Sequence, residues 1–319
     1  MSRIHEALKK AEQERAATQG TGGQAGYAST PVAEAAVYAA EVPPSIAMPP
    51  ADPAIHAPMA PNVGMPTFAS PFGVETLLAR CAPQPWKPDS ATMLFLNGED
   101  SQTGSEEFRT LRSRLYHTRE KMPLKKLLVT SALPREGKSF TAANLAQVLA
   151  RQQGRRVLLI DADLRGPRLH QMLGTSVSPG LAEYLQGQCD EFSIVQRGPL
   201  DNLFFIPTGH EIGNAAELVG NGKLKVLLQR LEPLFDWIIL DSPPAVPVSD
   251  ASILATACDG VLMVVRSNAT PFDAARKARE EFPQEMLVGV VLNGTHEGDM
   301  PYARYYYEAY EKKGTEVKA

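Results

Sequence analysis

The sequence predicts an α/β domain, in which a mostly parallel sheet carries helices on both faces. Two observations lead to this prediction. Short apolar segments alternate with helical segments between about residues 98 and 295, and several of the apolar segments run directly into polar or acidic residues. The alternation indicates the sheet, and the polar residues indicate the edge of the sheet at which ligands bind.

Six segments are short, apolar and rich in Val, Ile and Leu, as strands covered on both faces are. They are residues 127–130, 157–160, 203–206, 237–240, 261–265 and 287–292. Helices are predicted between several of these strands, at residues 140–152, 223–231 and 272–282. Because parallel neighbours are joined by crossover connections, usually helices, this order favours a parallel sheet.

The composition of the chain changes along its length. Near the N-terminus, Ile4, Ala7, Leu8 and Ala11 share one helical face. Half of the 26 prolines then fall in a stretch that we interpret as disordered, with room for a short helix around residues 73–80. The predicted parts are an amphipathic helix at residues 1–17, a Pro/Ala-rich linker at 18–97, the α/β domain at 98–297 and a tyrosine-rich tail at 298–319.

Bulk properties exclude several classes of protein. The 319 residues carry a formal net charge of -4, which argues against a nucleic-acid partner. Cys81, Cys189 and Cys258 lie far apart, so neither a disulfide framework nor a zinc site is predicted. No segment approaches the ~20 apolar residues that span a bilayer, and the N-terminus lacks the apolar core of a signal peptide. We therefore expect a cytoplasmic protein.

The strongest motif follows the first predicted strand. It consists of Ala132, Leu133, Pro134, Arg135, Glu136, Gly137, Lys138 and Ser139. It matches the P-loop pattern G-x-x-x-x-G-K-[ST], with Ala132 in place of the first glycine. The backbone N–H groups of such a loop and the N-terminus of the next helix, which Phe140 continues, bind phosphates. The motif predicts ATP as ligand, with Lys138 on the terminal phosphates and the Ser139 hydroxyl on Mg²⁺.

Two positions of the predicted nucleotide site leave alternatives open. Arg135 lies in the loop where glycine adopts a positive φ more freely, so it either tolerates that geometry or adds a cation near the phosphates. Asn293 ends the last predicted strand, and it either hydrogen-bonds the adenine base or is a simple turn residue.

Acidic residues follow two of the predicted strands. Asp161 and Asp163 follow residues 157–160, and Asp241 follows residues 237–240. Because ligands of doubly wound sheets lie at the carboxyl ends of strands, all three can face the phosphate loop. Asp163 and Asp241 are predicted to hold Mg²⁺ or its waters, and Asp161 is a candidate base for an incoming hydroxyl. Alternatively, such residues simply terminate strands.

Taken together, these motifs resemble the bacterial tyrosine kinases of exopolysaccharide and capsule assembly. The resemblance covers about residues 98–319 and rests on the P-loop, on a second acidic motif of the form D-x-D-x-R at 161–165, and on D-x-P-P at 241–244. Each motif alone is shared with MinD/ParA-like ATPases, but Leu133 replaces the lysine that opens the loop of that group. The resemblance implies a MinD/ParA-like P-loop NTPase fold and ATP-dependent tyrosine autophosphorylation.

The resemblance also implies self-association. The family carries E-x-x-R-x-x-R on the first helix of its domain, and Glu106, Arg109 and Arg112 match this pattern. A spacing of three residues places them along one helical stripe that a neighbouring subunit of a homo-oligomer could contact. The alternative is an ordinary solvated face.

The family's tyrosine cluster is present in the tail. Five of the nine tyrosines lie there, namely Tyr302, Tyr305, Tyr306, Tyr307 and Tyr310. The resemblance makes them the acceptors of phosphate in trans, whereas a terminal helix that packs its rings is the alternative. A regulatory ATPase that phosphorylates nothing is the rival function, and the tail argues against it.

The first residues of the chain, Met-Ser-Arg-Ile-His-Glu-Ala-Leu-Lys-Lys-Ala-Glu, look like the start of the exosortase-associated subgroup of these kinases. That subgroup implies a role in exopolysaccharide polymerisation or export. It further implies an integral-membrane polysaccharide co-polymerase, or chain-length determinant, as partner. The kinase would then lie peripherally at the inner membrane through that partner.

Overall fold

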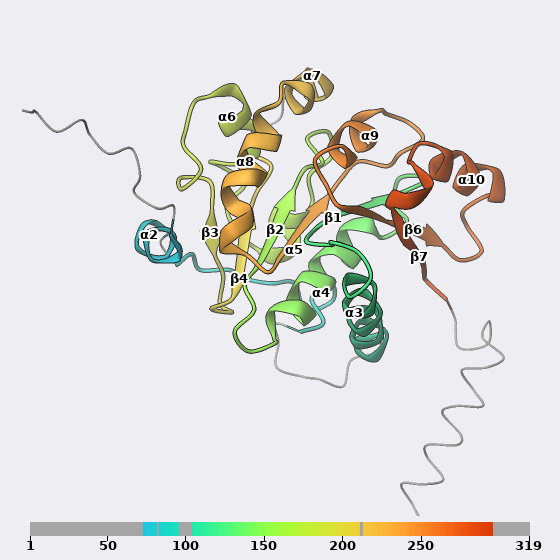
Figure 1. Ribbon diagram of the computed structural model, residues 1–319, viewed down its shortest axis with the longest axis horizontal. Coiled ribbons are helices and arrows are strands. Elements are labelled where there is room, and N and C mark those ends of the chain that lie inside the picture. The colour runs from blue at the N-terminus through green and yellow to red at the C-terminus, as the bar shows by residue number, and fades with distance from the viewer. Residues whose placement is uncertain (1–72, 82, 96–103, 211–212, 296–319) are drawn as a thin grey trace, which may run out of the picture. The chain divides into compact units, whose positions relative to one another are not determined.

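The computed structural model describes residues 73–81, 83–95, 104–210 and 213–295. Within these residues a seven-stranded sheet has the order β3-β4-β2-β5-β1-β6-β7 (Figure 1). Every neighbouring pair is parallel except β3 and β4. The predicted fold class is therefore confirmed.

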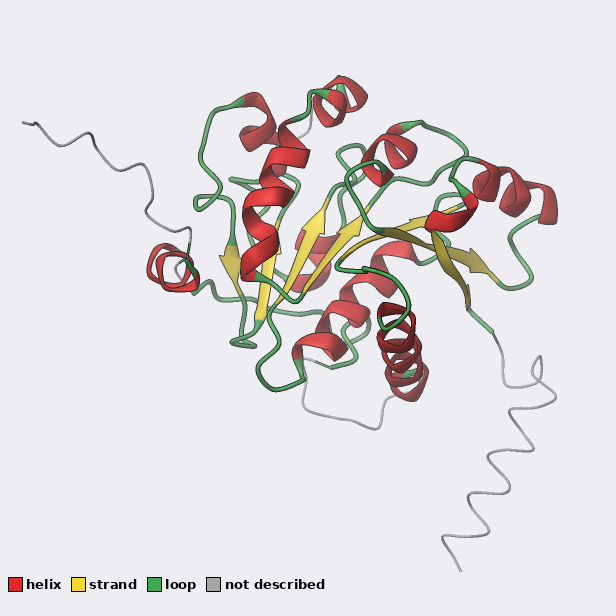
Figure 2. Ribbon diagram, in the orientation of Figure 1, coloured by secondary structure: helices red, strands yellow, loops and turns green. Residues whose placement is uncertain are grey.

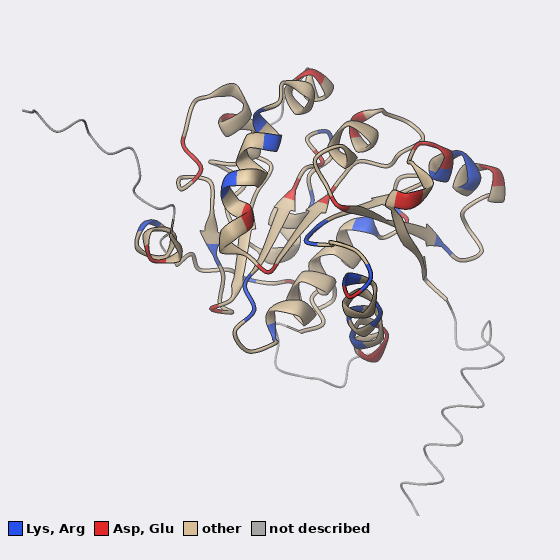
Figure 3. Ribbon diagram, in the orientation of Figure 1, with Lys and Arg blue, Asp and Glu red and all other residues tan. Residues whose placement is uncertain are grey.

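The six predicted strands are all present. The strands are β1 (Lys126–Ser131), β2 (Val157–Asp161), β3 (Gln196–Arg197), β4 (Leu203–Ile206), β5 (Trp237–Asp241), β6 (Gly260–Arg266) and β7 (Leu287–Asn293). The short antiparallel strand β3 was not predicted, because two residues carry no recognisable period. Charged residues lie mainly on helices and loops and at strand ends (Figure 3), as expected for strands that are buried on both faces.

Helices cover both faces of the sheet (Figure 2). One hydrophobic core lies between the sheet and α3 (Ser105–Arg119), α4 (Lys138–Ala150) and α5 (Leu169–Leu173). A second core lies on the other face. The helices that contribute to it are α2 (Val74–Arg80), α6 (Leu181–Gln186), α7 (Ala215–Gly220), α8 (Lys223–Leu231), α9 (Asp250–Ala255) and α10 (Phe272–Glu280). No helix in the described ranges combines the length and hydropathy needed to cross a bilayer.

Residues 83–95, which we call the N-terminal strap, pack on the domain although they were predicted to belong to the linker. Trp86, Met93 and Phe95 are buried in the core with α4. The backbone N–H groups of Leu94 and Phe95 donate to side-chain oxygens of α4, at 2.8 and 3.2 Å. The structured domain thus begins well before residue 98, because the strap's apolar side chains complete the core that α4 leaves open.

Several predictions fall outside the described residues. The N-terminal helix at residues 1–17 and the tail at residues 298–319 belong to this group.

The short helix expected around residues 73–80 is present as α2, which places Leu77 in the second core.

Candidate active site

The phosphate loop joins the end of β1 to the start of α4, as predicted. Arg135 has a φ of 66° and Gly137 a φ of 95°, so both lie in the left-handed region. Arg135 therefore tolerates the geometry that favours glycine. Its side chain also lines the cavity above the loop, so it adds a cation there as well. The first alternative for Arg135 is thus confirmed, and an interaction with phosphates stays a prediction.

The far side of the loop is held by the end of β7. The Nδ2 atom of Asn293 donates a hydrogen bond to the backbone oxygen of Glu136 at 2.9 Å. A Cβ atom on Gly137 would lie 2.0 Å from the same Nδ2, which explains why glycine is needed there. Asn293 is therefore more than a turn residue, because its side chain fixes the backbone of the phosphate loop.

The Glu136 side chain does not line the cavity but anchors the loop, a role that the motif does not reveal. Glu136 is 4% exposed. Its Oε2 atom accepts a hydrogen bond from the Leu133 backbone N–H at 2.8 Å, and its Oε1 atom accepts one from the Thr270 hydroxyl. Since Thr270 lies between β6 and α10, the loop is tied both to itself and to the neighbouring connection.

The carboxyl ends of β2 and β5 meet the start of α4, as predicted. The Lys138 Nζ atom donates to Asp163 Oδ2 at 2.8 Å and lies 3.5 Å from Asp241 Oδ2. The Ser139 hydroxyl donates to Asp241 Oδ2 at 2.5 Å. These four side chains form one buried network at the base of the cavity.

Asp161 lies deeper than Asp163. It is 0% exposed, and its two carboxylate oxygens accept hydrogen bonds from the backbone N–H groups of Asp163 and Leu169, at 3.3 and 3.1 Å. Asp163 lines the cavity, whereas Asp161 does not. The sequence suggested different roles for these two aspartates but could not show that only Asp163 reaches the cavity, because both follow the same strand.

Burial sets the protonation of this network. It raises the pKa of Asp161 to about 7, with the charge of Asp241 as the next cause. It raises the pKa of Asp241 to about 6, although the nearby Lys138 ammonium opposes this. For Lys138, burial lowers the pKa, but the attraction of Asp241 and Asp163 outweighs burial, and the pKa is raised above its usual value. The lysine therefore stays charged.

The oxygen atoms at this site fit a magnesium ion. Mg²⁺ prefers oxygen ligands and is usually held by one or two carboxylates together with substrate phosphates and water. Asp241 Oδ1 is buried and has no hydrogen-bond partner in the described structure, although such atoms are usually satisfied. The Ser139 hydroxyl lies beside the other oxygen of this carboxylate. A cation bound by Asp241 and Ser139 would satisfy the orphaned atom.

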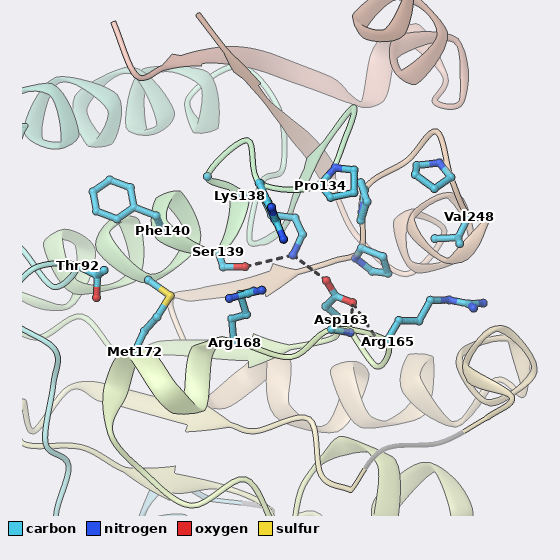
Figure 4. Close-up of a pocket in the computed structure, with 16 residues that line it drawn as sticks. Thr92, Pro134, Lys138, Ser139, Phe140, Asp163, Arg165, Arg168, Met172 and Val248 are labelled. Atoms are coloured by element: carbon cyan, nitrogen blue, oxygen red, sulfur yellow. Dashed lines mark hydrogen bonds and ion pairs between the residues drawn. The ribbon is translucent and has the colours of Figure 1, made fainter. Parts of the chain in front are cut away.

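A cavity of about 750 Å³ opens above this network (Figure 4). Its four lining cations, Arg135, Lys138, Arg165 and Arg168, suit a ligand with several negative charges. Thr92 of the strap and Met172 of α5 also line it, and the sequence did not predict either. Arg168 could have been predicted as a cavity residue, because it lies only five positions after Asp163 of the acidic motif. Thr92 could not, because only the folding of the strap onto the domain brings it to the cavity.

Arg165 is held in place by a residue from another element. Its Nε and Nη2 atoms donate to both carboxylate oxygens of Asp250, at 2.8 and 3.1 Å. Asp250 opens α9 and is 1% exposed. A bidentate pair of this kind fixes the plane of the guanidinium group. The arginine of the D-x-D-x-R motif thus lies at the cavity, and its guanidinium group is oriented by Asp250, which is 85 positions later in the chain.

The three residues predicted to face a neighbouring subunit do not behave alike. Glu106 and Arg109 pair on the surface of α3. Arg112 instead donates to the backbone oxygen of Val148 on α4, at 3.0 Å. Arg112 thus also joins two helices of its own domain, and the contact of all three residues with a neighbouring subunit stays a prediction.

The five predicted acceptor tyrosines lie outside the described residues. Tyr116 and Tyr184, by contrast, are half-buried within the domain. The Tyr116 hydroxyl accepts a hydrogen bond from Trp237 Nε1 at 3.2 Å, and burial raises the pKa of Tyr184. Both side chains therefore make contacts within their own domain.

The sheet order, the phosphate loop and the acidic strand ends define an ATP-binding domain of the P-loop NTPase class. A family model described as an AAA domain, AAA_31, matches residues 136–275. The tyrosine-protein kinase YwqD of Bacillus subtilis (strain 168) is 37% identical over 198 residues, which cover 61% of this chain and 83% of YwqD. The chain therefore belongs to the bacterial tyrosine-protein kinase family, and its enzyme class is protein-tyrosine kinase.

Other relatives agree with this assignment. The tyrosine-protein kinase wzc of Salmonella typhimurium (strain LT2) is 30% identical over 222 residues, but these cover 69% of this chain and only 31% of wzc. The kinase domain of the Escherichia coli tyrosine kinase ETK has a similar structure, with a TM-score of 0.58 and 30% identity over 60% of this chain and 76% of that domain. This chain thus spans less than a third of the length of wzc.

Proposed function

We propose that this kinase transfers the γ-phosphoryl group of ATP to tyrosines in the C-terminal tail of another copy of the chain. In this reaction the phenol oxygen forms a bond to the γ-phosphorus, and the bond from that phosphorus to the β–γ bridging oxygen breaks. The phenol proton passes to a carboxylate of the site, and ADP leaves. We also propose that the chain consists of the four segments predicted from the sequence, except that the kinase domain begins with the N-terminal strap.

One observation carries this proposal. The Lys138 ammonium lies within 3.5 Å of two carboxylates that come from different strands, at the base of a cavity lined by cations. Phosphates that enter this cavity would replace the carboxylates as partners of Lys138. A preorganised cation of this kind stabilises the charge that develops during phosphoryl transfer.

We assign the remaining roles from the same geometry. The backbone of residues 132–140 binds the phosphates, and Asn293 acts by fixing that backbone. Ser139, Asp241 and Asp163 are the proposed oxygen ligands of Mg²⁺ or its waters, and the ion supplies charge neutralisation when bound.

Asp161 is the proposed base. Its pKa, raised to about 7, suits proton transfer near neutral pH. Asp163 lines the cavity, whereas Asp161 does not, and the Asp163 carboxylate is held by Lys138 at 2.8 Å. Release of Asp163 when Lys138 turns to phosphate would give the phenol access to Asp161. If Asp163 stays in place, it becomes the better-placed base, and variants of the two residues distinguish these cases.

The decisive test is phosphotyrosine detection after purified protein is incubated with Mg-ATP. The wild type should label itself, and a variant with Phe at all five tail tyrosines should bind ATP normally but lose most of the label. Label that persists on Tyr116 or Tyr184 would contradict the acceptor assignment. Absence of label in wild type, with ATP hydrolysis intact, would favour a regulatory ATPase instead.

We further propose that the chain belongs to the exosortase-associated subgroup and acts on exopolysaccharide polymerisation or export. The opening dodecapeptide supports the subgroup. The apolar helical stripe predicted at residues 1–17 would suit the groove of a membrane-bound co-polymerase, which would hold the kinase at the inner membrane. Deletion of residues 1–17 should spare activity in vitro and reduce polymer in cells. Loss of activity in the purified deletion variant would instead place this segment in the catalytic unit.

A further inference from the structure

The active-site cavity has two apolar ends, and only one of them suits the nucleoside. Phe140, Met172 and Thr92 lie at one end, and Lys138 and Asp163 lie in the middle (Figure 4). Pro134 and Val248 lie at the other end (Figure 4), and Pro244 and Pro247, from the same chain segment as Val248, also line the cavity; we call these four residues the proline wall. The wall combines the start of the phosphate loop with the chain that follows β5.

The direction of the triphosphate follows from the loop. A P-loop lysine reaches the β- and γ-phosphates, while the loop backbone and the first turn of the helix hold the phosphates nearer the nucleoside. The γ-phosphate of a bound ATP would therefore lie beside Lys138 and Asp163. Its nucleoside would lie beyond Phe140, on the side of α4.

In-line transfer then decides where the acceptor enters. The attacking oxygen must lie opposite the leaving oxygen of the β–γ bridge. The approach is therefore from the side remote from Phe140, and the proline wall lies on that side of Lys138 (Figure 4). Arg165 is the cation at this end, and Asp250 holds its guanidinium group.

The chemistry of the wall matches a phenol. Pro134 and Pro247 are exposed, and Pro244 and Val248 are half-buried, so they present an apolar surface at the mouth of a charged cavity. Tyrosine has an apolar ring and a polar tip, and it suits a site of which one side is apolar and the other polar. We infer that the proline wall binds the ring of the acceptor tyrosine while its hydroxyl points to the γ-phosphate. This inference rests on the proposed function and adds the acceptor subsite to it.

The wall accounts for a preference for tyrosine over serine. A serine hydroxyl sits on a single carbon, so a serine that reached the γ-phosphate could not also cover the wall. The ring, rather than the hydroxyl, should therefore provide most of the binding energy. Phenylalanine at the acceptor positions should bind as tyrosine does, although it cannot react.

The first test measures binding alone, without catalysis. Synthetic peptides with the sequence of residues 298–319 are titrated into the full chain by calorimetry, with Tyr, Phe or Ser at the five tyrosine positions. We expect similar affinity for the Tyr and Phe peptides and about tenfold weaker binding of the Ser peptide, the loss expected when part of an apolar contact is removed. Equal binding of all three peptides would overturn the inference.

The second test changes the wall. The enzyme is a chain with its five tail tyrosines replaced by Phe, and the substrate is the Tyr peptide of residues 298–319. The double variant Pro247→Ser, Val248→Ser should raise the KM for this peptide about tenfold and leave the affinity for ATP unchanged. Val226→Ser is the matched control, because Val226 is 49% exposed on α8 and away from the cavity.

The outcomes separate the inference from the function on which it rests. Unchanged ATP affinity shows that the variant is folded, and Val248→Thr, which keeps the shape of the side chain, should give a smaller rise in KM. An unchanged KM in the double variant, or an equal rise in the control, would overturn the subsite. If the enzyme with an unchanged wall produces no phosphotyrosine on the Tyr peptide, the proposed function fails. The peptide titrations still decide whether the proline wall binds aromatic side chains.

Discussion

The ammonium group of Lys138 lies 2.8 Å from the carboxylate of Asp163. Lys138 opens α4 and Asp163 follows β2, so this contact joins two motifs that are 25 positions apart. The side chains are only 10% and 7% exposed. Because a buried charge needs a partner, Lys138 both prepares the site for phosphate and balances the carboxylates around it.

Lys138→Met should abolish autophosphorylation and also destabilise the fold. Lys138 is buried and balances the carboxylates of Asp163 and Asp241. Removal of one partner from a buried ion pair costs about 3–5 kcal/mol. Urea denaturation would measure this loss, with Lys138→Arg as the variant that keeps the charge. Wild-type stability in the Met variant would show that the contact adds nothing to the fold.

Asp161→Asn and Asp163→Asn should have different effects. If Asp161 is the base, Asp161→Asn slows phosphate transfer while ATP remains bound. Asp163→Asn removes the hydrogen-bonded partner of Lys138 and a proposed Mg²⁺ contact, so it should raise the Mg²⁺ concentration needed for half-maximal activity. Single-turnover rates across a Mg²⁺ titration separate the two effects. Identical curves for both variants would remove the proposed division of roles.

The nucleotide-free protein should lose stability as the pH rises through the neutral range. The pKa of Asp161 is raised to about 7 and that of Asp241 to about 6, from 3.8 for an unperturbed side chain. Between pH 3.8 and about pH 7, the folded state holds more protons than the unfolded state. The free energy of unfolding therefore falls as the pH rises over this range. Denaturation at about pH 5.5 and pH 7.5 tests this expectation. Asp161→Asn should flatten the profile, and an unaltered slope in that variant would assign the effect to other groups.

Arg109→Ala and Arg112→Ala should separate assembly from stability. Arg109 pairs with Glu106 on the surface of α3. If α3 is the predicted interface between copies of the chain, loss of Arg109 should reduce the particle mass in light scattering and slow labelling at low protein concentration. Arg112 bonds to Val148 of the same domain, and its loss should lower the free energy of unfolding by about 1–2 kcal/mol. A normal oligomer in Arg109→Ala would argue against α3 as the interface.

The N-terminal strap should be required for a stable domain. Trp86 is 8% exposed, and its ring lies 6.1 Å from that of Phe205, nearly perpendicular to it. A truncated chain that begins at residue 98 should therefore unfold at lower urea than one that begins at residue 73. In the full chain, Trp86→Ala should cost about 3–5 kcal/mol, whereas Leu78→Ala, at a position 39% exposed, is the control. Equal midpoints for the two truncated chains would mean that the strap is not part of the cooperative unit.

The parallel sheet could be predicted because its strands are nearly continuous apolar runs. Burial on both faces demands such runs, and their spacing leaves room for crossover helices. The phosphate loop and the acidic strand ends could likewise be found, since each is a local pattern next to a strand. The short helices α5, α6, α7 and α9 were missed, because five or six residues hold too few turns to show a period.

By itself, the sequence determined the elements and chemistry that depend on neighbouring residues: the strand order along the chain, the P-loop and the carboxylates that follow β2 and β5. The tertiary structure alone decided contacts between distant positions. It put Asp250 on Arg165, Asn293 on the phosphate loop and the strap against α4. It also buried Asp161 below Asp163, although both follow one strand. The physical reason is that burial and hydrogen-bond partners depend on how elements pack, and one strand's sequence does not specify what packs against it.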